Sequence, residues 1–208
     1  MLIFLGAKID LSQGVFRPRV ETKEWVGKVI EEIRIELKKQ PKKSCRVLDI
    51  FAGSGCIGLA ILKNISQAQV DFAEIDPSFI NQIKINLKIN QIDPQRSRVI
   101  QSNIFGNISK KYNYILANPP YIAEKRKYLV HSSVLEKDPA GALWSGKDGL
   151  KHLKKFLAEI KSYLYSGGKT YFEFSPEQKN KLEDFISAGM KIDFFKDKYG
   201  MWRWAKLQ

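Results

Sequence analysis

Residues 47–55 read Val-Leu-Asp-Ile-Phe-Ala-Gly-Ser-Gly, a short apolar run that passes into a glycine turn. The apolar run over residues 45–50 is typical of a buried strand, and the residues from 55 to 63 are typical of a helix. Gly53 and Gly55 let the backbone approach a ligand closely, because glycine accepts dihedral angles that strain other residues. The stretch therefore predicts a strand, a turn and a helix. A ligand at the turn is the favoured interpretation, and a tight turn without one is the alternative.

Strand-like and helix-like patterns alternate along the rest of the chain. We expect helices over residues 22–39, 55–63, 76–89, 148–165 and 176–188, and strands over residues 45–50, 69–75, 98–101, 112–117, 169–174, 190–196 and 200–207. Thr22 is a possible N-cap of the first helix, and Gly167-Gly168 is expected to end the fourth. The alternation predicts an α/β fold with a mostly parallel sheet and helices on both faces. The last two strands lack a long crossover, so we expect them to pair antiparallel.

Composition limits the class of protein. The chain has 208 residues, 44% of them hydrophobic, and suits one domain. No stretch approaches the roughly 20 apolar residues that span a membrane. Cys45 and Cys56 form no disulfide framework, so we expect a soluble, cytoplasmic protein. We see no set of metal ligands and expect His131 and His152 to lie on the surface.

The net charge is +13, from 35 basic and 22 acidic residues. Such a charge suits contact with nucleic acid, an acidic protein partner or simple solubility, and it does not choose among them. The cluster Lys125-Arg126-Lys127 lies a few residues beyond the 112–117 strand, after the loop that follows this strand. It is either a solvated loop or a contact to an acidic substrate surface or RNA.

Glu74 ends the second predicted strand, about 20 residues after the glycine turn, where an acid can hold ribose hydroxyls. Phe51 stands where a further glycine is usual in dinucleotide sites. An adenosyl ligand without a pyrophosphate therefore fits the pattern better than a dinucleotide.

Asn118-Pro-Pro-Tyr-Ile follows the 112–117 strand. The two prolines fix the backbone and remove two N–H donors, which leaves carbonyl oxygens free to accept hydrogen bonds. An amide side chain and a carbonyl can then grip a planar NH2 group, with Tyr121 against its face. Accepting both hydrogens orients the nitrogen lone pair toward an electrophile, which stabilises the transition state more than the ground state.

The glycine turn, Glu74 and Asn118-Pro-Pro-Tyr121 together resemble a class I S-adenosylmethionine-dependent methyltransferase that acts on an amino or amide nitrogen. The whole chain resembles the bacterial release factor glutamine methyltransferases. The matching segments are Pro18-Arg-Val-Glu-Thr22, Gly55-Cys-Ile57, Asp138-Pro139, Ala142-Leu143, Gly146-Lys-Asp-Gly-Leu150, Glu173, Gln178, Asp197, Gly200 and Arg203. The resemblance implies a Rossmann-like, seven-stranded, mostly parallel sheet with an antiparallel C-terminal hairpin.

The resemblance also implies roles for matched positions. The residues implied to bind S-adenosylmethionine are Asp49, Phe51, Ala52, Gly53, Ser54, Gly55, Glu74, Ile75, Asn103, Ile104 and Asn118, with Asp49 supporting the turn. Those implied to hold the reacting glutamine amide are Asn118, Pro119, Pro120 and Tyr121. No dedicated base is expected, because the nitrogen becomes acidic once it is methylated.

Some positions depart from the family pattern. Phe51 replaces a glycine, Val20 a proline, Glu74 an aspartate and Asn103 an acid. We expect the family's N-terminal helical domain to be absent, with residues 1–40 packing as a segment and helix on a methyltransferase domain over residues 41–208.

The favoured function is the one that the resemblance implies, N5-methylation of a glutamine in the Gly-Gly-Gln loop of a peptide chain release factor. The alternatives are an adenine-N6 or other amino-group methyltransferase acting on RNA or DNA, a ribosomal-protein glutamine methyltransferase, and a silent binding module.

Overall fold

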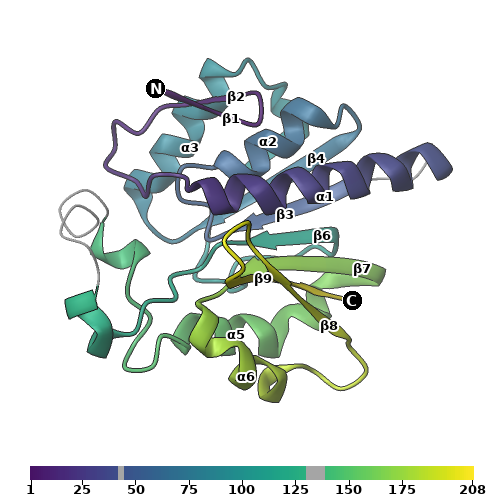
Figure 1. Ribbon diagram of the computed structural model, residues 1–208. Coiled ribbons are helices and arrows are strands. Elements are labelled where there is room, and N and C mark those ends of the chain that lie inside the picture. The colour runs from purple at the N-terminus through teal and green to yellow at the C-terminus, as the bar shows by residue number, and fades with distance from the viewer. Residues whose placement is uncertain (42–44, 130–138) are drawn as a thin grey trace.

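Seven strands form one sheet through the molecule (Figure 1), and the computed structural model describes residues 1–41, 45–129 and 139–208. In chain order these strands are β3 (Cys45–Ile50), β4 (Ala68–Glu74), β5 (Ser97–Gln101), β6 (Tyr112–Ala117), β7 (Leu164–Glu173), β8 (Ile192–Lys196) and β9 (Trp202–Leu207). They lie in the order β5-β4-β3-β6-β7-β9-β8. β9 runs antiparallel to both of its neighbours, β7 and β8, and the other strand pairs of this sheet are parallel. The predicted α/β class, the mostly parallel sheet and the antiparallel C-terminal hairpin are confirmed.

Helices cover both faces of this sheet (Figure 1). One face carries α1 (Val20–Lys39), α2 (Cys56–Asn64) and α3 (Pro77–Ile89), and the other carries α5 (Lys151–Glu159) and α6 (Lys179–Leu182). Short 3-10 segments lie at Pro94–Arg96, Glu124–Leu129, Ala140–Ala142, Ile160–Tyr163, Pro176–Gln178 and Glu183–Phe185. Side chains alternate between two cores: Val47 packs with the α1–α2 side, and Leu48 and Ile50 pack with the α5 side. This alternation is the two-residue period of a strand buried on both faces.

A small hairpin precedes α1 and was not expected from the sequence. Its strands are β1 (Leu2–Phe4) and β2 (Ala7–Ile9). Leu5 and Gly6 between them both have positive φ, 46° and 85°, as a tight two-residue hairpin turn requires. Leucine is a poor residue for that conformation, so the usual sequence signal for such a turn is missing.

Buried amides at the C-terminal end of α3 fasten this hairpin and the segment that follows it. Asn90 exchanges two hydrogen bonds with the backbone of Lys8, at 2.8 and 2.6 Å, and Asn86 Oδ1 accepts from the Asp10 N–H at 2.8 Å. Asn86 Nδ2 also donates to the carbonyl of Ser54 in the glycine turn at 2.9 Å. The N-terminal segment and the glycine turn are therefore tied to the same helix. The hairpin and α1 contribute to one hydrophobic core with α2, while a domain boundary at residues 40 and 41 stays a prediction.

The helix predicted over residues 148–165 is too long. The α-helix ends at Glu159, and β7 already begins at Leu164. Gly167 and Gly168 do not end a helix but sit inside β7, where its register against β6 shifts. A Cβ on Gly168 would come within 3.1 Å of the Tyr112 carbonyl oxygen, so the glycines permit a bulge at a close backbone approach.

Two further helix predictions need correction. The helix predicted over residues 176–188 is only one turn of α-helix between two 3-10 segments, because Leu182 is the single buried side chain between residues 179 and 185. Thr22 is not the N-cap of α1. The N-cap is Arg19, and Thr22 lies inside the first turn with its side chain buried.

A buried carboxylate joins β3 to α2. Asp49 Oδ2 accepts a hydrogen bond from the Gly58 N–H at 2.8 Å, and Oδ1 has no partner among the described residues. Burial raises the pKa of Asp49 well above its usual range, and the bond from Gly58 only partly opposes this. Gly58 also packs tightly, because a Cβ there would lie 2.4 Å from the Phe72 ring and 2.8 Å from Val70.

Replacing Gly58 with alanine tests this packing. We expect Gly58→Ala to lower the free energy of unfolding by about 1–3 kcal/mol through overpacking. Gly27→Ala is the matched control. Gly27 lies inside α1, and among the described residues a Cβ there would meet Leu5 at 3.9 Å and nothing nearer. It should raise stability by about 0.5–1 kcal/mol. Urea unfolding measures both, and equal effects of the two substitutions would contradict this packing.

The titration of Asp49 changes the stability of the fold in one direction as pH rises. Its pKa is raised in the folded chain, so the folded state keeps the proton to higher pH than the unfolded state, and stability falls as pH rises through that range. Asp49→Asn removes this titration. We therefore expect wild type to lose stability relative to the variant as pH rises above about 4, the usual value for an unfolded Asp, as measured by urea unfolding. A difference that is constant or opposite in slope would contradict the assignment.

Candidate functional site

The site forms where two neighbouring parallel strands end. Ile50 of β3 lies opposite Ala117 of β6, so the chain leaves the sheet at Phe51 and Asn118 side by side. A cavity of about 320 Å³ opens there, within the roughly 300–1,000 Å³ common for small-molecule sites. Ligands of α/β sheets bind at this carboxyl edge.

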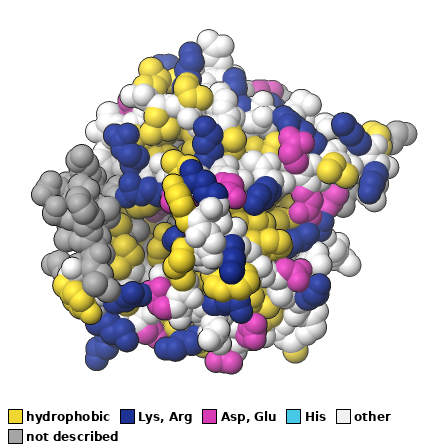
Figure 2. Space-filling model, in the orientation of Figure 1, with side chains coloured by type: hydrophobic (Ala, Val, Ile, Leu, Met, Phe, Trp, Pro, Cys, Tyr) yellow, Lys and Arg dark blue, Asp and Glu magenta, His cyan; other side chains and the backbone are white. Residues whose placement is uncertain are grey.

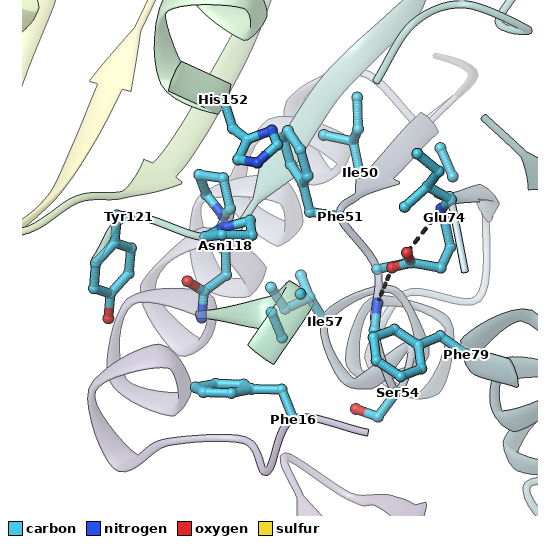
Figure 3. Close-up of a pocket in the computed structure, with 18 of the residues that line it drawn as sticks. Phe16, Ile50, Phe51, Ser54, Ile57, Glu74, Phe79, Asn118, Tyr121 and His152 are labelled. Carbon is cyan, nitrogen blue, oxygen red and sulfur yellow. Dashed lines mark hydrogen bonds between the residues drawn. The ribbon is translucent and has the colours of Figure 1, made fainter. Parts of the chain in front are cut away.

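Most of the predicted site residues line this one cavity (Figure 3). Those in its wall are Phe51, Ala52, Gly53, Ser54, Glu74, Ile75, Asn103, Ile104, Asn118, Pro119, Pro120 and Tyr121. Asp49 and Gly55 lie outside the wall. Asp49 bonds to α2 rather than to the turn itself, and Gly55 packs against Ile83.

The glycine turn has a strained backbone. Phe51, Gly53 and Gly55 have φ of 60°, 53° and 75°, so a phenylalanine occupies a left-handed conformation that normally favours glycine. A Cβ on Gly53 would meet nothing within 4 Å, whereas one on Gly55 would lie 3.3 Å from Ile83. Gly53 therefore leaves open space beside the cavity, and Gly55 lets the turn pack on α3.

Glu74 organises the turn from the end of β4. Its carboxylate accepts from the N–H groups of Gly53 at 2.8 Å, Ile75 at 2.7 Å and Asp76 at 3.1 Å. Figure 3 shows the carboxylate between the turn and the strand end, at the cavity wall. Burial raises the pKa of Glu74, although these three bonds favour its ionised form. The lone pairs that remain on its oxygens can still accept from ligand hydroxyls.

A second strained loop follows β5. Ile104 has φ of 54°, a genuine outlier for a β-branched residue, and lines the cavity beside exposed Asn103. Ser102 donates to the Ile104 carbonyl at 2.7 Å and accepts from the Asn107 N–H at 3.0 Å, which holds the loop in this shape. Strain of this kind gathers at ligand sites, where surrounding contacts maintain it.

The Asn118–Tyr121 loop is held from several sides. Asn118 Nδ2 donates to the Thr22 hydroxyl oxygen at 3.3 Å, and Figure 3 shows the Asn118 amide directed toward Phe16 across the cavity. Gln178 Nε2 donates to the carbonyls of Tyr121 and Gly149, each at 2.9 Å. Gln178 therefore clamps the loop to the turn before α5. Burial raises the pKa of the Tyr121 hydroxyl, so that group stays neutral.

The structure adds wall residues that were not among the predicted site residues. They are Phe16, Pro18, Arg19, Thr22, Ile50, Cys56, Ile57, Ala73, Phe79, Ser102, Ile122, Gly141, Ala142, Leu143 and His152. The first three lie in the segment that leads into α1 and Thr22 lies in its first turn, a stretch that the resemblance matched only as a motif. Their role depends on where that segment crosses the sheet edge, and local periodicity carries no signal of that crossing.

The prediction that His152 is a surface residue is wrong. It lines the cavity from α5, with its ring 6.1 Å from the Phe51 ring and nearly edge-on to it. Burial lowers the pKa of His152, with a further contribution from Lys151, so the neutral ring is favoured. His131 and Asp138 lie outside the described residues.

Few other features of the described segments suggest a separate site. No cluster of three or more His, Cys, Asp or Glu side chains is arranged for a metal in the described ranges. No helix in those ranges is long and apolar enough to cross a membrane. In the basic cluster, Arg126 forms an ion pair with Glu177. Figure 2 shows Lys and Arg spread over the visible face with acidic and apolar side chains between them.

Solved structures share this fold. The ribosomal protein L11 methylase from Lactobacillus delbrueckii subsp. bulgaricus has a TM-score of 0.63 at 16% identity, covering 93% of this chain and 80% of that one. The hMettl16 catalytic domain, in complex with the MAT2A 3′UTR hairpin 6, has a TM-score of 0.67 at 16% identity, covering 98% and 75%. The sheet is thus the Rossmann-like sheet of class I methyltransferases.

Sequence comparison narrows the family. Residues 34–146 match the methyltransferase small domain. The release factor glutamine methyltransferase of Rhodopirellula baltica is 31% identical over 175 residues, which cover 83% of this chain but 58% of that protein. That of Flavobacterium psychrophilum is 30% identical over 211 residues, covering 98% of this chain and 71% of that protein. With its strand-end cavity and Asn-Pro-Pro-Tyr loop, the chain belongs to the release factor glutamine methyltransferase family.

Proposed function

We propose that this chain transfers a methyl group from S-adenosylmethionine to the side-chain amide nitrogen of a glutamine, in the Gly-Gly-Gln loop of a peptide chain release factor. The observation that carries the proposal is the placement of Asn118. Its amide nitrogen is engaged by Thr22, and its oxygen is left to accept from an NH2 group in the same cavity that Glu74 and the glycine turn line. The names of the relatives support the glutamine and the release factor.

The cavity suits an adenosyl ligand. The open space at Gly53 admits a ligand close to the backbone, and the Glu74 carboxylate at the wall can accept from ribose hydroxyls. Ile75, Asn103 and Ile104 offer apolar surface and one amide for an adenine ring. Bound there, S-adenosylmethionine supplies an electrophilic methyl group on a sulfonium sulfur.

Asn118 and the following prolines orient the nucleophile. An amide nitrogen is a weak nucleophile because its lone pair is delocalised into the carbonyl. Asn118 Oδ1 and the Pro119 carbonyl can each accept one N–H of the substrate amide. With both hydrogens held in this way, the nitrogen lone pair points out of the plane of the NH2 group. These acceptors are fixed before reaction, and they gain strength as the nitrogen becomes positive, so they favour the transition state.

Tyr121 and the neighbouring apolar wall exclude water from the reacting nitrogen. The ring comes from the same loop as Asn118, and burial keeps its hydroxyl neutral. The methylated nitrogen is a strong acid, so its proton leaves without a dedicated basic side chain.

An amino-group methyltransferase for nucleic acid is the second candidate. Asn-Pro-Pro-Tyr is also suited to an adenine amino group, and the net charge of +13 is compatible with binding nucleic acid. Such an enzyme would need a flipped or single-stranded base in the cavity, and its binding would weaken steeply with salt.

A methyl-transfer assay separates these functions. Labelled S-adenosylmethionine is given to the chain with release factor, ribosomal protein, tRNA, rRNA and DNA in separate reactions. We expect label on the release factor, mapped by mass spectrometry to one glutamine. Label on nucleic acid or on ribosomal protein alone would refute the release factor as substrate.

Asn118→Ala should abolish most of this activity. We expect kcat to fall by about 100-fold or more, as for loss of one group that stabilises developing charge. The dissociation constant for S-adenosylmethionine should stay close to wild type, measured by calorimetry. Unchanged kcat in a folded Asn118→Ala variant would contradict the role of this amide.

Glu74→Ala should act mainly on cofactor binding, whereas Asn118→Ala acts mainly on kcat. Removing the carboxylate leaves the N–H groups of Gly53 and Ile75 without their acceptor and takes away the partner for the ribose. We expect the dissociation constant for S-adenosylmethionine to rise by roughly tenfold or more. Cofactor affinity as tight as that of Asn118→Ala would show that Glu74 holds no part of the ligand.

A further inference from the structure

Thr22 occupies an unusual position for a threonine in a helix. It lies in the first turn of α1, it is 1% exposed, and its hydroxyl does not cap the helix. The hydroxyl oxygen instead accepts from Asn118 Nδ2 across 96 residues of sequence. A hydroxyl has one hydrogen and two lone pairs, so what it donates to decides what it can accept.

A buried acid at the end of β7 faces the Thr22 hydroxyl. Glu173 is 1% exposed, and the Thr22 hydroxyl helps to stabilise the charged form of its carboxyl group. Glu173 Oε1 also accepts from the Trp25 indole N–H at 2.7 Å. Thr22 and Trp25 lie three residues apart on one face of α1 and both point at this acid. Burial raises the pKa of Glu173, while the Thr22 hydroxyl, the Trp25 N–H and the charge of the Arg203 guanidinium oppose this shift and favour the ionised form.

The donor and acceptor roles among Glu173, Thr22 and Asn118 depend on one another. In its ionised form Glu173 has only acceptors, and the Trp25 indole N–H only donates, so the Thr22 hydrogen then goes to Glu173. The Thr22 lone pairs then face Asn118, which can meet them only with its NH2 group. A rotated Asn118 amide would set its oxygen against the hydroxyl oxygen and lose the bond.

We infer that Thr22 and Glu173 are positioning residues that hold Asn118 with its oxygen toward the reacting nitrogen, and so select an NH2-bearing substrate. The inference rests on the proposed function and deepens it. With the amide rotated, Asn118 would present its own N–H groups to the substrate N–H groups, and donor would face donor.

The same logic predicts the effect of neutralising Glu173. In Glu173→Gln, Trp25 can only donate, so the new amide oxygen accepts from it and the new NH2 group faces Thr22. The Thr22 hydroxyl then accepts from that NH2 group, and its hydrogen is free to donate to Asn118 Oδ1 with the amide rotated. The variant keeps the size of the side chain but no longer fixes the Asn118 oxygen toward the cavity.

Four variants test the inference on release factor methylation: Thr22→Ser, Thr22→Val, Glu173→Gln and the double variant Thr22→Val/Glu173→Gln. Thr22→Val keeps the shape and removes the hydroxyl, and we expect kcat to fall by about tenfold or more with S-adenosylmethionine affinity and melting temperature close to wild type. Thr22→Ser restores the hydroxyl and should keep kcat within about threefold of wild type. The double variant should lose no more than the worse single variant, because both changes act through one amide.

Several outcomes would overturn the inference. A folded Thr22→Val enzyme with kcat close to wild type shows that Asn118 needs no partner. Equal losses in Thr22→Ser and Thr22→Val, or losses that track melting temperature, show that Thr22 only supports packing. Fully additive losses in the double variant show that Glu173 does not act through Thr22.

An NMR measurement tests the orientation without activity. The Asn118 side-chain NH2 signals, assigned by their loss in Asn118→Ala, should exchange slowly with solvent in wild type and Thr22→Ser. They should exchange at least about tenfold faster in Thr22→Val and Glu173→Gln, where the NH2 group loses Thr22 as acceptor. Equal exchange rates in all four proteins overturn the inference. A wild type that labels no release factor refutes the proposed function, while these exchange rates still decide the orientation of Asn118.

Discussion

The parallel pairing of β3 with β6 is the constraint on which the rest of the site depends. Because Ile50 lies opposite Ala117, the two loops that leave these strands start at adjacent positions on one sheet edge. One loop is the glycine turn and the other carries Asn118. A shift of register by one residue would turn every side chain of β3 to the other face and separate the loops. The cavity is therefore a consequence of strand register.

The loops themselves are held by distant segments. Glu74 accepts from Gly53 in the glycine turn, Asn86 donates to the Ser54 carbonyl, and Gln178 clamps Tyr121. The bonds to Gly53 and Ser54 hold the turn in which Phe51 has a left-handed conformation, and the Ser102 bonds hold the loop in which Ile104 has one. Buried carboxylates supply part of this support, and burial raises the pKa of both Asp49 and Glu74. The chain thus gives up some stability to keep the site in shape.

The sequence was informative wherever a local rule decides the structure. Apolar runs located the strands of the sheet, and Asp76-Pro77 started α3 as expected, with Asp76 accepting from the Ser78 N–H at 2.8 Å. Twelve residues that the motifs and the family resemblance named lie in the cavity wall, where they follow strands whose carboxyl ends meet. The misses depend on contacts between segments far apart in the chain. Thr22 resembles an N-cap by type, His152 faces the cavity only because of how α5 crosses the sheet, and Gly167-Gly168 forms a bulge against β6 rather than a helix end.

The central claim is that Asn118 holds the amide nitrogen of a substrate glutamine at the cofactor pocket. A crystal structure of the chain with S-adenosylhomocysteine and the release factor tests it most directly. The account predicts that the Gly-Gly-Gln glutamine enters beside Tyr121 and that its NH2 group donates to Asn118 Oδ1 and to the Pro119 carbonyl. A glutamine bound elsewhere, or an Asn118 amide that points its NH2 group at the substrate, would contradict it.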